Sequence, residues 1–303
     1  MAKHLIVLDI DNTVFDWVTY YVNAMGSLFK GVSEITGIAS SKLETEAKQV
    51  FTHHGSIEYP FLIQELPSVI NHFNGDIERI LSEAVSHGRK LFNDTAREYL
   101  KPYPSIPSTL GSIRSLWPEC AIIALTDAPR YVAMWKLNKL GLLGYFDAVY
   151  GLPDPKLPTD PKSKKAKVDA EILLKHLEQH DFSFKGLIRT LPIDYEKPGV
   201  KGLKTVLMDF DMEDDKDQVL WVGDNLRKDV GLGKRLGVKT VWAQYGTNIE
   251  ENIRERLLAF SPDTNVARNV SLDPMSKDSP TPDYILPTCS HLSEVLKTVI
   301  NSK

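Results

Sequence analysis

Short, almost uninterrupted runs of apolar residues recur along the chain at wide intervals. They cover residues 5–8, 121–125, 219–222, 240–243 and 284–286. Runs of this length without polar alternation are typical of strands covered on both faces, and such strands occur mainly in parallel sheets whose helical crossovers shield each side. The pattern therefore predicts an α/β fold, in which a Rossmann-like parallel sheet is flanked by helices.

Helical periodicity lies between these runs. A helix is predicted at residues 108–116, where apolar residues recur at helical spacing until Pro118 stops the helix. A second helix is predicted to begin after Asp224 and to run towards Gly237. A third, amphipathic helix is predicted at residues 292–300, so we expect the end of the chain to be packed.

More than a hundred residues separate the first two apolar runs. Within this interval, apolar positions show helical spacing near residues 17–28 and again near residues 77–85. The interval is too long for a simple crossover. We therefore predict a helical cap domain at residues 16–101, inserted into an α/β catalytic core formed by residues 1–15 and 102–303.

Two stretches are predicted to be irregular surface segments. Residues 151–167 contain four prolines followed by four closely spaced lysines, and residues 261–282 are rich in Ser, Pro, Asp and Asn. We interpret the lysines as a solvated surface and assign them no binding role.

Composition and charge exclude several classes of protein. The formal net charge is -4, with 36 Lys plus Arg against 40 Asp plus Glu, which argues against a nucleic-acid partner bound by broad electrostatic attraction. No apolar stretch is long enough to span a bilayer, and the run at residues 5–8 is too short for a signal peptide, so we predict no membrane association. The two cysteines, Cys120 and Cys289, have no metal-ligand spacing and fit a reducing cytoplasm.

Polar residues follow three of the predicted strands at the point where each ends. Asp9 and Asp11 follow the first strand, and because side chains alternate across a strand, both point into one crevice. Taken alone, they could also be solvated turn acids. However, Thr126 follows the second run and Asp224 follows the third. Ligands of open parallel sheets bind outside the carboxyl ends of the strands, so this recurrence predicts a site there.

These residues resemble the four motifs of the haloacid dehalogenase superfamily. The motifs are matched in order by Asp9-Ile10-Asp11-Asn12-Thr13, by Thr126, by a lysine near Lys197, and by Gly223-Asp224-Asn225-Leu226-Arg227-Lys228-Asp229. Each motif is weak alone, but the set is specific and spans nearly the whole chain. The insertion after the first motif is similar to that of family members whose cap lies at this point.

The resemblance implies a nucleophile and a metal ion. Asp9 is expected to attack phosphorus and form an aspartyl-phosphate, while Asp11 serves as the neighbouring acid and base. Mg²⁺ is the expected cofactor, because several carboxylates that face a phosphate need a hard cation between them. Its ligands would come from Asp9, the Asp11 carbonyl and Asp224, with Asp229 as a further ligand or one step behind the ligands.

The resemblance also implies phosphate-binding residues. Thr126 is expected to donate its hydroxyl to a phosphoryl oxygen, and Lys197 is expected to supply positive charge. Lys201 and Lys204 lie close behind and are alternatives to Lys197. Asp127, next to Thr126, departs from the expected pattern and either tunes the substrate or caps the following helix.

The function implied is hydrolysis of a small phosphorylated metabolite, such as a nucleotide, flavin mononucleotide or sugar phosphate. Family members that remove halide lack an acid at the position of Asp11, so its presence favours phosphoryl transfer. A phosphomutase of the same superfamily is the alternative enzyme, and a receiver-like or scaffold protein is the alternative outside catalysis. The sequence gives no indication of the oligomeric state.

Overall fold

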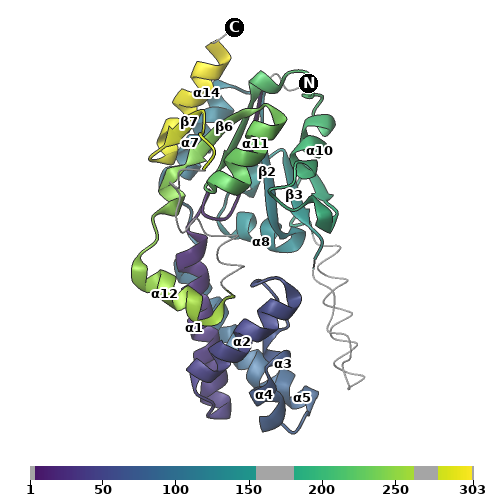
Figure 1. Ribbon diagram of the computed structural model, residues 1–303, viewed down its shortest axis with the longest axis vertical. Coiled ribbons are helices and arrows are strands. Elements are labelled where there is room, and N and C mark those ends of the chain that lie inside the picture. The colour runs from purple at the N-terminus through teal and green to yellow at the C-terminus, as the bar shows by residue number, and fades with distance from the viewer. Residues whose placement is uncertain (1–3, 155–180, 263–278, 302–303) are drawn as a thin grey trace.

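The computed structural model describes residues 4–154, 181–262 and 279–301. Within them, seven parallel strands form one sheet in the order β4-β3-β2-β1-β5-β6-β7, with β1 at the centre. The strands are β1 (His4–Leu8), β2 (Cys120–Pro129), β3 (Ala148–Leu152), β4 (Leu187–Thr190), β5 (Val219–Gly223), β6 (Lys239–Ala243) and β7 (Tyr284–Leu286). The predicted α/β fold with a parallel sheet flanked by helices is therefore confirmed (Figure 1).

The five apolar runs all form strands of this sheet, and their side chains divide between two cores. In β1, Ile6 and Leu8 pack on one face, while Leu5 and Val7 pack on the other. The sequence pattern does not predict β3 and β4. The edge strand β4 is largely exposed, so it has no apolar run that could reveal it.

Helices cover both faces of the sheet. They are α7 (Ile106–Leu116), α8 (Arg130–Lys139), α10 (Lys201–Asp209), the π-helical turn η5 (Leu226–Val230), α11 (Gly231–Leu236) and α14 (Leu292–Asn301). Short 3-10 turns lie at Leu143–Tyr145, Ile193–Tyr195, Lys216–Gln218, Gln244–Thr247 and Cys289–His291. Apolar residues of α7, α8 and α14 join the Ile6 face, and those of α10 and α11 join the Leu5 face. The three helices predicted from periodicity correspond to α7, to η5 with α11, and to α14.

A helical region lies between β1 and β2 and extends away from the sheet (Figure 1). Its helices are α1 (Trp17–Thr36), α2 (Ser40–His54), α3 (Leu62–Glu65), α4 (Pro67–His72), α5 (Ile77–Arg79), the π-helical segment η1 (Ile80–Val85) and α6 (Ser86–Tyr99). Asp16 caps α1 by accepting a hydrogen bond from the Thr19 N–H, and Gly37 ends the helix in the left-handed conformation. Helix α6 packs along α1, where Gly31 and Gly88 allow close contact of the two backbones.

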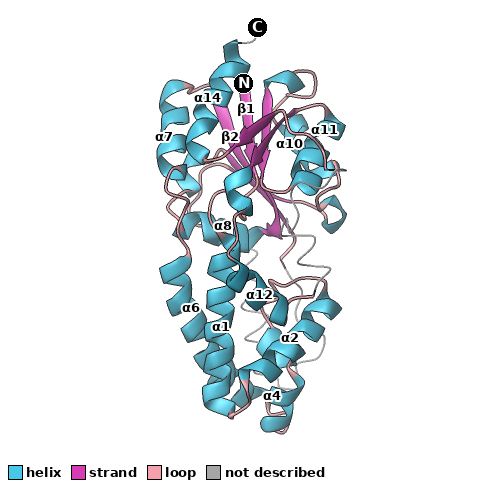
Figure 2. Cartoon of the chain, turned by 60° about the vertical axis from the view of Figure 1, so that its left-hand side comes forward, coloured by secondary structure: helices cyan, strands magenta, loops and turns pink. Residues whose placement is uncertain are grey.

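One later helix, α12 (Glu251–Phe260), leaves the sheet after β6 and packs on α1 and α2 (Figure 2). The Phe260 ring lies 5.7 Å from that of Phe29, and Arg256 Nη1 donates to Asn23 Oδ1 at 3.0 Å. The division of the chain into residues 16–101 and two flanking segments does not anticipate this packing. The helical region thus packs against a helix from the second half of the chain.

The predicted irregular stretch at residues 151–167 begins too early, because Gly151 and Leu152 are buried in β3. Most of the rest of it, and most of the stretch at residues 261–282, lies outside the described residues, since residues 155–180 and 263–278 are not among them. In the described part of the chain, no helix combines the length and apolar character that crossing a bilayer requires.

Candidate active site

The strand order places one crevice at the centre of the sheet. The chain runs outward from β1 to β4 and then returns to β5 on the other side of β1. At such a switch point the loops that follow neighbouring strands diverge and leave a crevice at their carboxyl ends. Asp9 follows β1 and Asp224 follows β5, so the crevice lies between two predicted site residues.

The loop after β1 is fixed on several sides. The Asp9 N–H donates to the Val222 carbonyl at 2.9 Å. Asn12 has a φ of 57°, a conformation that asparagine tolerates, and its Oδ1 accepts from the Trp17 N–H at 3.1 Å. The Tyr245 hydroxyl donates to the Thr13 carbonyl. The acids of this loop are therefore tied to both the first helix of the helical region and the turn after β6.

Three buried acids meet in this crevice. One carboxylate oxygen each of Asp9, Asp224 and Asp229 lies within 4.8 Å of the other two, and we call this group the carboxylate cluster. Trp242 Nε1 donates to the Asp224 carbonyl at 2.8 Å. The Asn225 N–H donates to Asp229 Oδ2 at 3.0 Å. Backbone and ring donors thus hold the two later acids in place.

Lys197 lies at the carboxylate cluster. Its Nζ is 2.9 Å from Asp9 Oδ1 and 2.9 Å from Asp229 Oδ1, and its side chain is only 5% exposed. Lys201 pairs instead with the exposed Asp194, and Lys204 is exposed on α10. Of the three lysines considered from the sequence, Lys197 is therefore the one that faces the acids.

Thr126 lies at the same edge of the sheet. Leu8 pairs with Ala124 across β1 and β2, so Thr126, two residues further along, lies beyond the end of β1. The buried Thr126 hydroxyl oxygen accepts from the Ala128 N–H at 3.1 Å, and among the described residues its proton has no acceptor. This hydroxyl can therefore donate a hydrogen bond to a ligand.

Asp127 holds two lysines near the site. Its Oδ1 accepts from the Lys197 backbone N–H at 2.9 Å, and its Oδ2 accepts from Lys228 Nζ at 2.8 Å. The helix that follows has Pro129 at its N-cap, and the Tyr131 N–H in its first turn donates to Asp154 Oδ1, so the helix-capping role considered for Asp127 is wrong. Asp127 instead ties the Lys197 loop to the end of β2.

Asp11 has a different environment from the carboxylate cluster. Its Oδ1 and Oδ2 accept from Lys136 Nζ at 2.9 and 3.1 Å, and the same nitrogen donates to Glu58 Oε1 at 2.7 Å. Burial raises the pKa of Asp11 to about 6, with Lys136 opposing the rise and Glu58 adding to it. Asp11 thus titrates close to neutral pH in this arrangement, as a group that exchanges protons must.

The sequence prediction missed Lys136 and Glu58. Lys136 lies on α8 among the buried residues Ala133, Met134 and Leu137. A lysine within an apolar stripe is a signal, because a buried ammonium needs an acidic partner. Glu58 lies in a loop of the helical region, and no local pattern distinguishes it from other surface glutamates.

Comparisons with known proteins bear on the fold of the chain and on one part of its sequence. A family model described as HAD-hydrolase-like matches residues 195–272. The fold matches that of a 2-haloacid dehalogenase from Pseudomonas syringae pv. tomato at a TM-score of 0.56, with 15% identity over 98% of this chain and 99% of that one. Residues 195–272 are therefore similar to a HAD-hydrolase-like domain, and the chain as a whole shares its fold with solved haloacid dehalogenase-like structures. No curated protein sequence matches it significantly.

Two other solved structures share the fold. A HAD phosphatase from Thermococcus onnurineus matches at a TM-score of 0.51, with 17% identity over 97% of this chain and 98% of that one. A candidate β-phosphoglucomutase from Thermotoga maritima matches at 0.52, with 16% identity over 98% and 100%. At these identities the likeness establishes the fold alone, and the reaction has to be argued from the site.

The carboxylate cluster fits a divalent cation. Three buried acids face the single ammonium of Lys197. Asp9 Oδ1 lies 2.9 Å from Lys197 Nζ, but it is a buried oxygen without a well-directed hydrogen bond. Oxygen ligands of this kind suit Mg²⁺. Both oxygens of Asp229 already accept from Lys197 and Asn225, which favours a supporting position behind the ligands.

Burial is the main cause of the pKa shifts of the acids in the carboxylate cluster. Burial raises the pKa of Asp9 to about 7, against the opposing charge of Lys197. Burial also raises the pKa of Asp224 well above its usual range, and Asp229 adds to the rise. For Lys197, burial lowers the pKa, but the nearby acids outweigh it and the pKa is raised. A divalent cation would favour the ionised acids.

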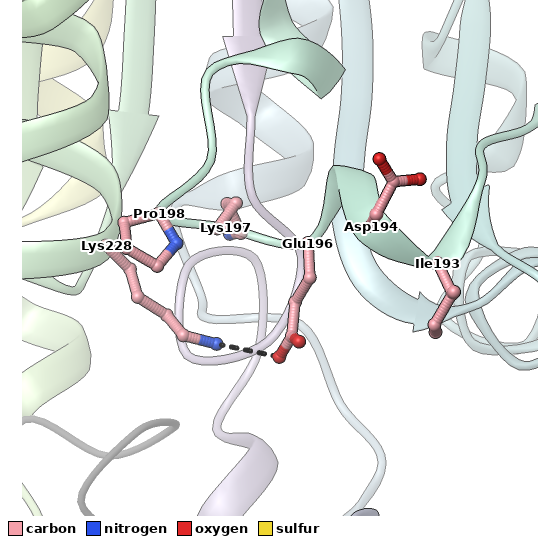
Figure 3. A pocket seen from close by; sticks show the side chains of 6 residues that line it. All are labelled: Ile193, Asp194, Glu196, Lys197, Pro198 and Lys228. Carbon is pink, nitrogen blue, oxygen red and sulfur yellow. Dashed lines mark ion pairs between the residues drawn. The ribbon is translucent and has the colours of Figure 1, made fainter.

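A cavity of about 320 Å³ lies beside Lys197 (Figure 3). Figure 3 shows Lys228 and Glu196 reaching towards each other, and their charged groups are 3.8 Å apart. The lining residues are Ile193, Asp194, Glu196, Lys197, Pro198 and Lys228. The cavity thus borders the lysine of the site on the side of the loop between β4 and α10.

Gly223 is required for the packing of Asp229. A Cβ atom at Gly223 would lie 2.3 Å from Asp229 Cγ, which is buried and cannot move freely. We expect Gly223→Ala to lower the free energy of unfolding by about 1–3 kcal/mol, the usual cost of overpacking, in a denaturant titration. Gly144→Ala is the control, because a Cβ there meets nothing within 4 Å. Equal stability of the two variants would contradict the expected clash.

Proposed function

We propose that this protein is a Mg²⁺-dependent phosphatase that hydrolyses a small phosphorylated metabolite through an aspartyl-phosphate on Asp9. The observation that carries the proposal is the position of Lys197 Nζ, 2.9 Å from both Asp9 and Asp229, at the carboxyl edge of the sheet. A nucleophile, a fixed positive charge and a group of metal-binding oxygens then lie within one crevice. The helical region at residues 16–101 would act as the cap over this crevice.

In the first step, a carboxylate oxygen of Asp9 attacks phosphorus in line, and the bond from phosphorus to the ester oxygen breaks. Asp11 gives its proton to that departing oxygen, which leaves as an alcohol. Lys197 and the Thr126 hydroxyl stabilise the negative charge on the phosphoryl oxygens as it spreads in the transition state.

In the second step, water attacks the phosphorus of the aspartyl-phosphate. Asp11 takes a proton from this water, and the bond between phosphorus and the Asp9 carboxylate breaks to give inorganic phosphate. When bound, Mg²⁺ would supply positive charge between the acids and the phosphoryl oxygens. Asp9, the Asp11 carbonyl and Asp224 would hold it, with Asp229 in support.

Asp11 also separates this proposal from dehalogenation. A halide leaves without a proton, so a dehalogenase has no need of an acid at this position, whereas an alkoxide leaving group needs one.

The two cysteines are buried and unpaired, which supports the cytoplasmic location that we also propose.

The test is phosphate release from a panel of nucleoside monophosphates, flavin mononucleotide and sugar phosphates. We expect release with Mg²⁺, loss of release in EDTA, recovery on added Mg²⁺ and poor support by Ca²⁺, whose coordination is looser. Halide release from 2-haloacids is measured in parallel and is expected to be absent. Equal activity with and without chelator would remove the metal from the proposal. Halide release, or transfer of phosphate between sugar positions without release, would replace the phosphatase by a dehalogenase or a mutase.

A further inference from the structure

Lys136 links the general acid to the helical region. Its Nζ donates to both carboxylate oxygens of Asp11 and to Glu58 Oε1, which uses all three of its protons. Its side chain is only 1% exposed. Lys136 is therefore enclosed and cannot itself contact a substrate, so it acts by holding the two acids in position.

Glu58 is held firmly on the side of the helical region. Its Oε1 also accepts from Trp17 Nε1 at 3.0 Å. The Trp17 ring stacks on Tyr21 with centroids 4.9 Å apart, and the Tyr21 hydroxyl donates to the Ile57 carbonyl next to Glu58. Two aromatic residues of α1 thus fix both the side chain and the backbone of this position.

The second oxygen of Glu58 is available for a ligand. Within the described residues, Glu58 Oε2 has no hydrogen-bond partner, and the side chain is 16% exposed. Since Lys136 Nζ lies 2.9 Å from Asp11 Oδ1 and 2.7 Å from Glu58 Oε1, those two oxygens are at most 5.6 Å apart, the sum of the distances. Glu58 therefore lies beside the acid that would protonate the departing oxygen.

We propose that Glu58 selects the leaving group of the substrate. When Asp11 is ionised, Asp11 and Glu58 carry two negative charges against the one positive charge of Lys136, and when Asp11 holds its proton, the negative charge that remains beside the leaving group is that of Glu58. Glu58 Oε2 accepts a hydrogen bond from a hydroxyl or ammonium group of the leaving group and repels a second phosphate or a carboxylate. This rests on the proposed function and narrows it to esters of neutral or cationic hydroxylated compounds.

The test uses two pairs of phosphate esters that differ in the charge of the leaving group. They are glycerol 3-phosphate with 3-phosphoglycerate, and glucose 1-phosphate with glucose 1,6-bisphosphate. We expect wild-type protein to prefer the neutral member of each pair by about tenfold or more in kcat/KM, and Glu58→Gln to reduce this ratio by about tenfold. Glu58→Asp keeps the charge and should keep the direction of the preference. Glu83→Gln, which changes a glutamate paired with Arg79 on the exposed surface of η1, should leave the ratio unchanged.

Binding to the Asp9→Asn protein, measured by calorimetry with the same four esters, separates the two proposals. A preference for the neutral esters that Glu58→Gln removes would support the role of Glu58, even if no ester is hydrolysed and the phosphatase proposal fails. Hydrolysis with a preference that Glu58→Gln does not change would overturn the role of Glu58 and leave the phosphatase proposal standing. Binding of none of the four esters would also overturn it. Circular dichroism and thermal unfolding verify that each variant is folded.

Discussion

Asp9→Asn abolishes phosphate release, with an expected fall in kcat of at least about 10³-fold, because an amide cannot replace a carboxylate as the nucleophile. The two side chains are nearly isosteric, and Asp9 is only 7% exposed, so the surrounding packing should be retained. Initial rates with Mg²⁺, on whichever ester of the panel wild-type protein hydrolyses fastest, give the comparison. Circular dichroism establishes that the variant is folded.

The matched control is Asp214→Asn, which makes the same chemical change at an exposed position after α10. It should retain wild-type rates. A second readout is covalent phosphate on the protein after acid quenching, which hydroxylamine should release from wild type and which should be absent from Asp9→Asn. Turnover by Asp9→Asn near the wild-type rate would assign the nucleophile elsewhere.

Lys136→Met should lower the free energy of unfolding by about 3–5 kcal/mol, the range found when one partner of a buried ion pair is removed. The variant leaves Asp11 and Glu58 close together with no positive charge between them. Water screens their repulsion only in part, because their side chains are only 24% and 16% exposed. The measurement is a denaturant titration near neutral pH, where both acids contribute to the loss.

Adding Glu58→Gln to Lys136→Met should recover part of the lost stability, because one of the two repelling charges is then gone. Lys30→Met is the control, since Lys30 pairs with Glu34 on the exposed surface of α1, and such pairs contribute at most about 1 kcal/mol. A loss for Lys136→Met no larger than that of the control would show that Lys136 does not stabilise the two acids.

The sequence predicts those site residues that belong to short local patterns. Asp9, Asp11 and Asp224 follow apolar runs directly, and the geometry of a parallel sheet brings the ends of such runs together without further information. The strands β1, β2, β5 and β6 are predictable because apolar runs buried on both faces form them, whereas β3 is also fully buried and is not among the predicted strands. The edge strand β4 is exposed, so its composition does not distinguish it from a loop.

Contacts between distant segments could not be predicted in this way. Lys197 is predicted only through the family resemblance, with Lys201 and Lys204 as alternatives, and it is the path of the loop before α10 that brings Lys197 to the acids. Glu58 and Lys136 are 78 positions apart and meet where a loop of the helical region reaches α8. Such a contact depends on how segments distant in sequence are placed in the fold, and local periodicity does not predict that placement.

Helix α12 limits how the helical region can be transferred to another protein. Residues 16–101 could be grafted onto a related core as one continuous segment, but the graft would leave behind the helix that packs on α1 and α2. The apolar surface around Phe29 would then lose Phe260 and face water. A working chimera should therefore carry α12 with the insert, and recombination of natural sequences would have to exchange both segments together.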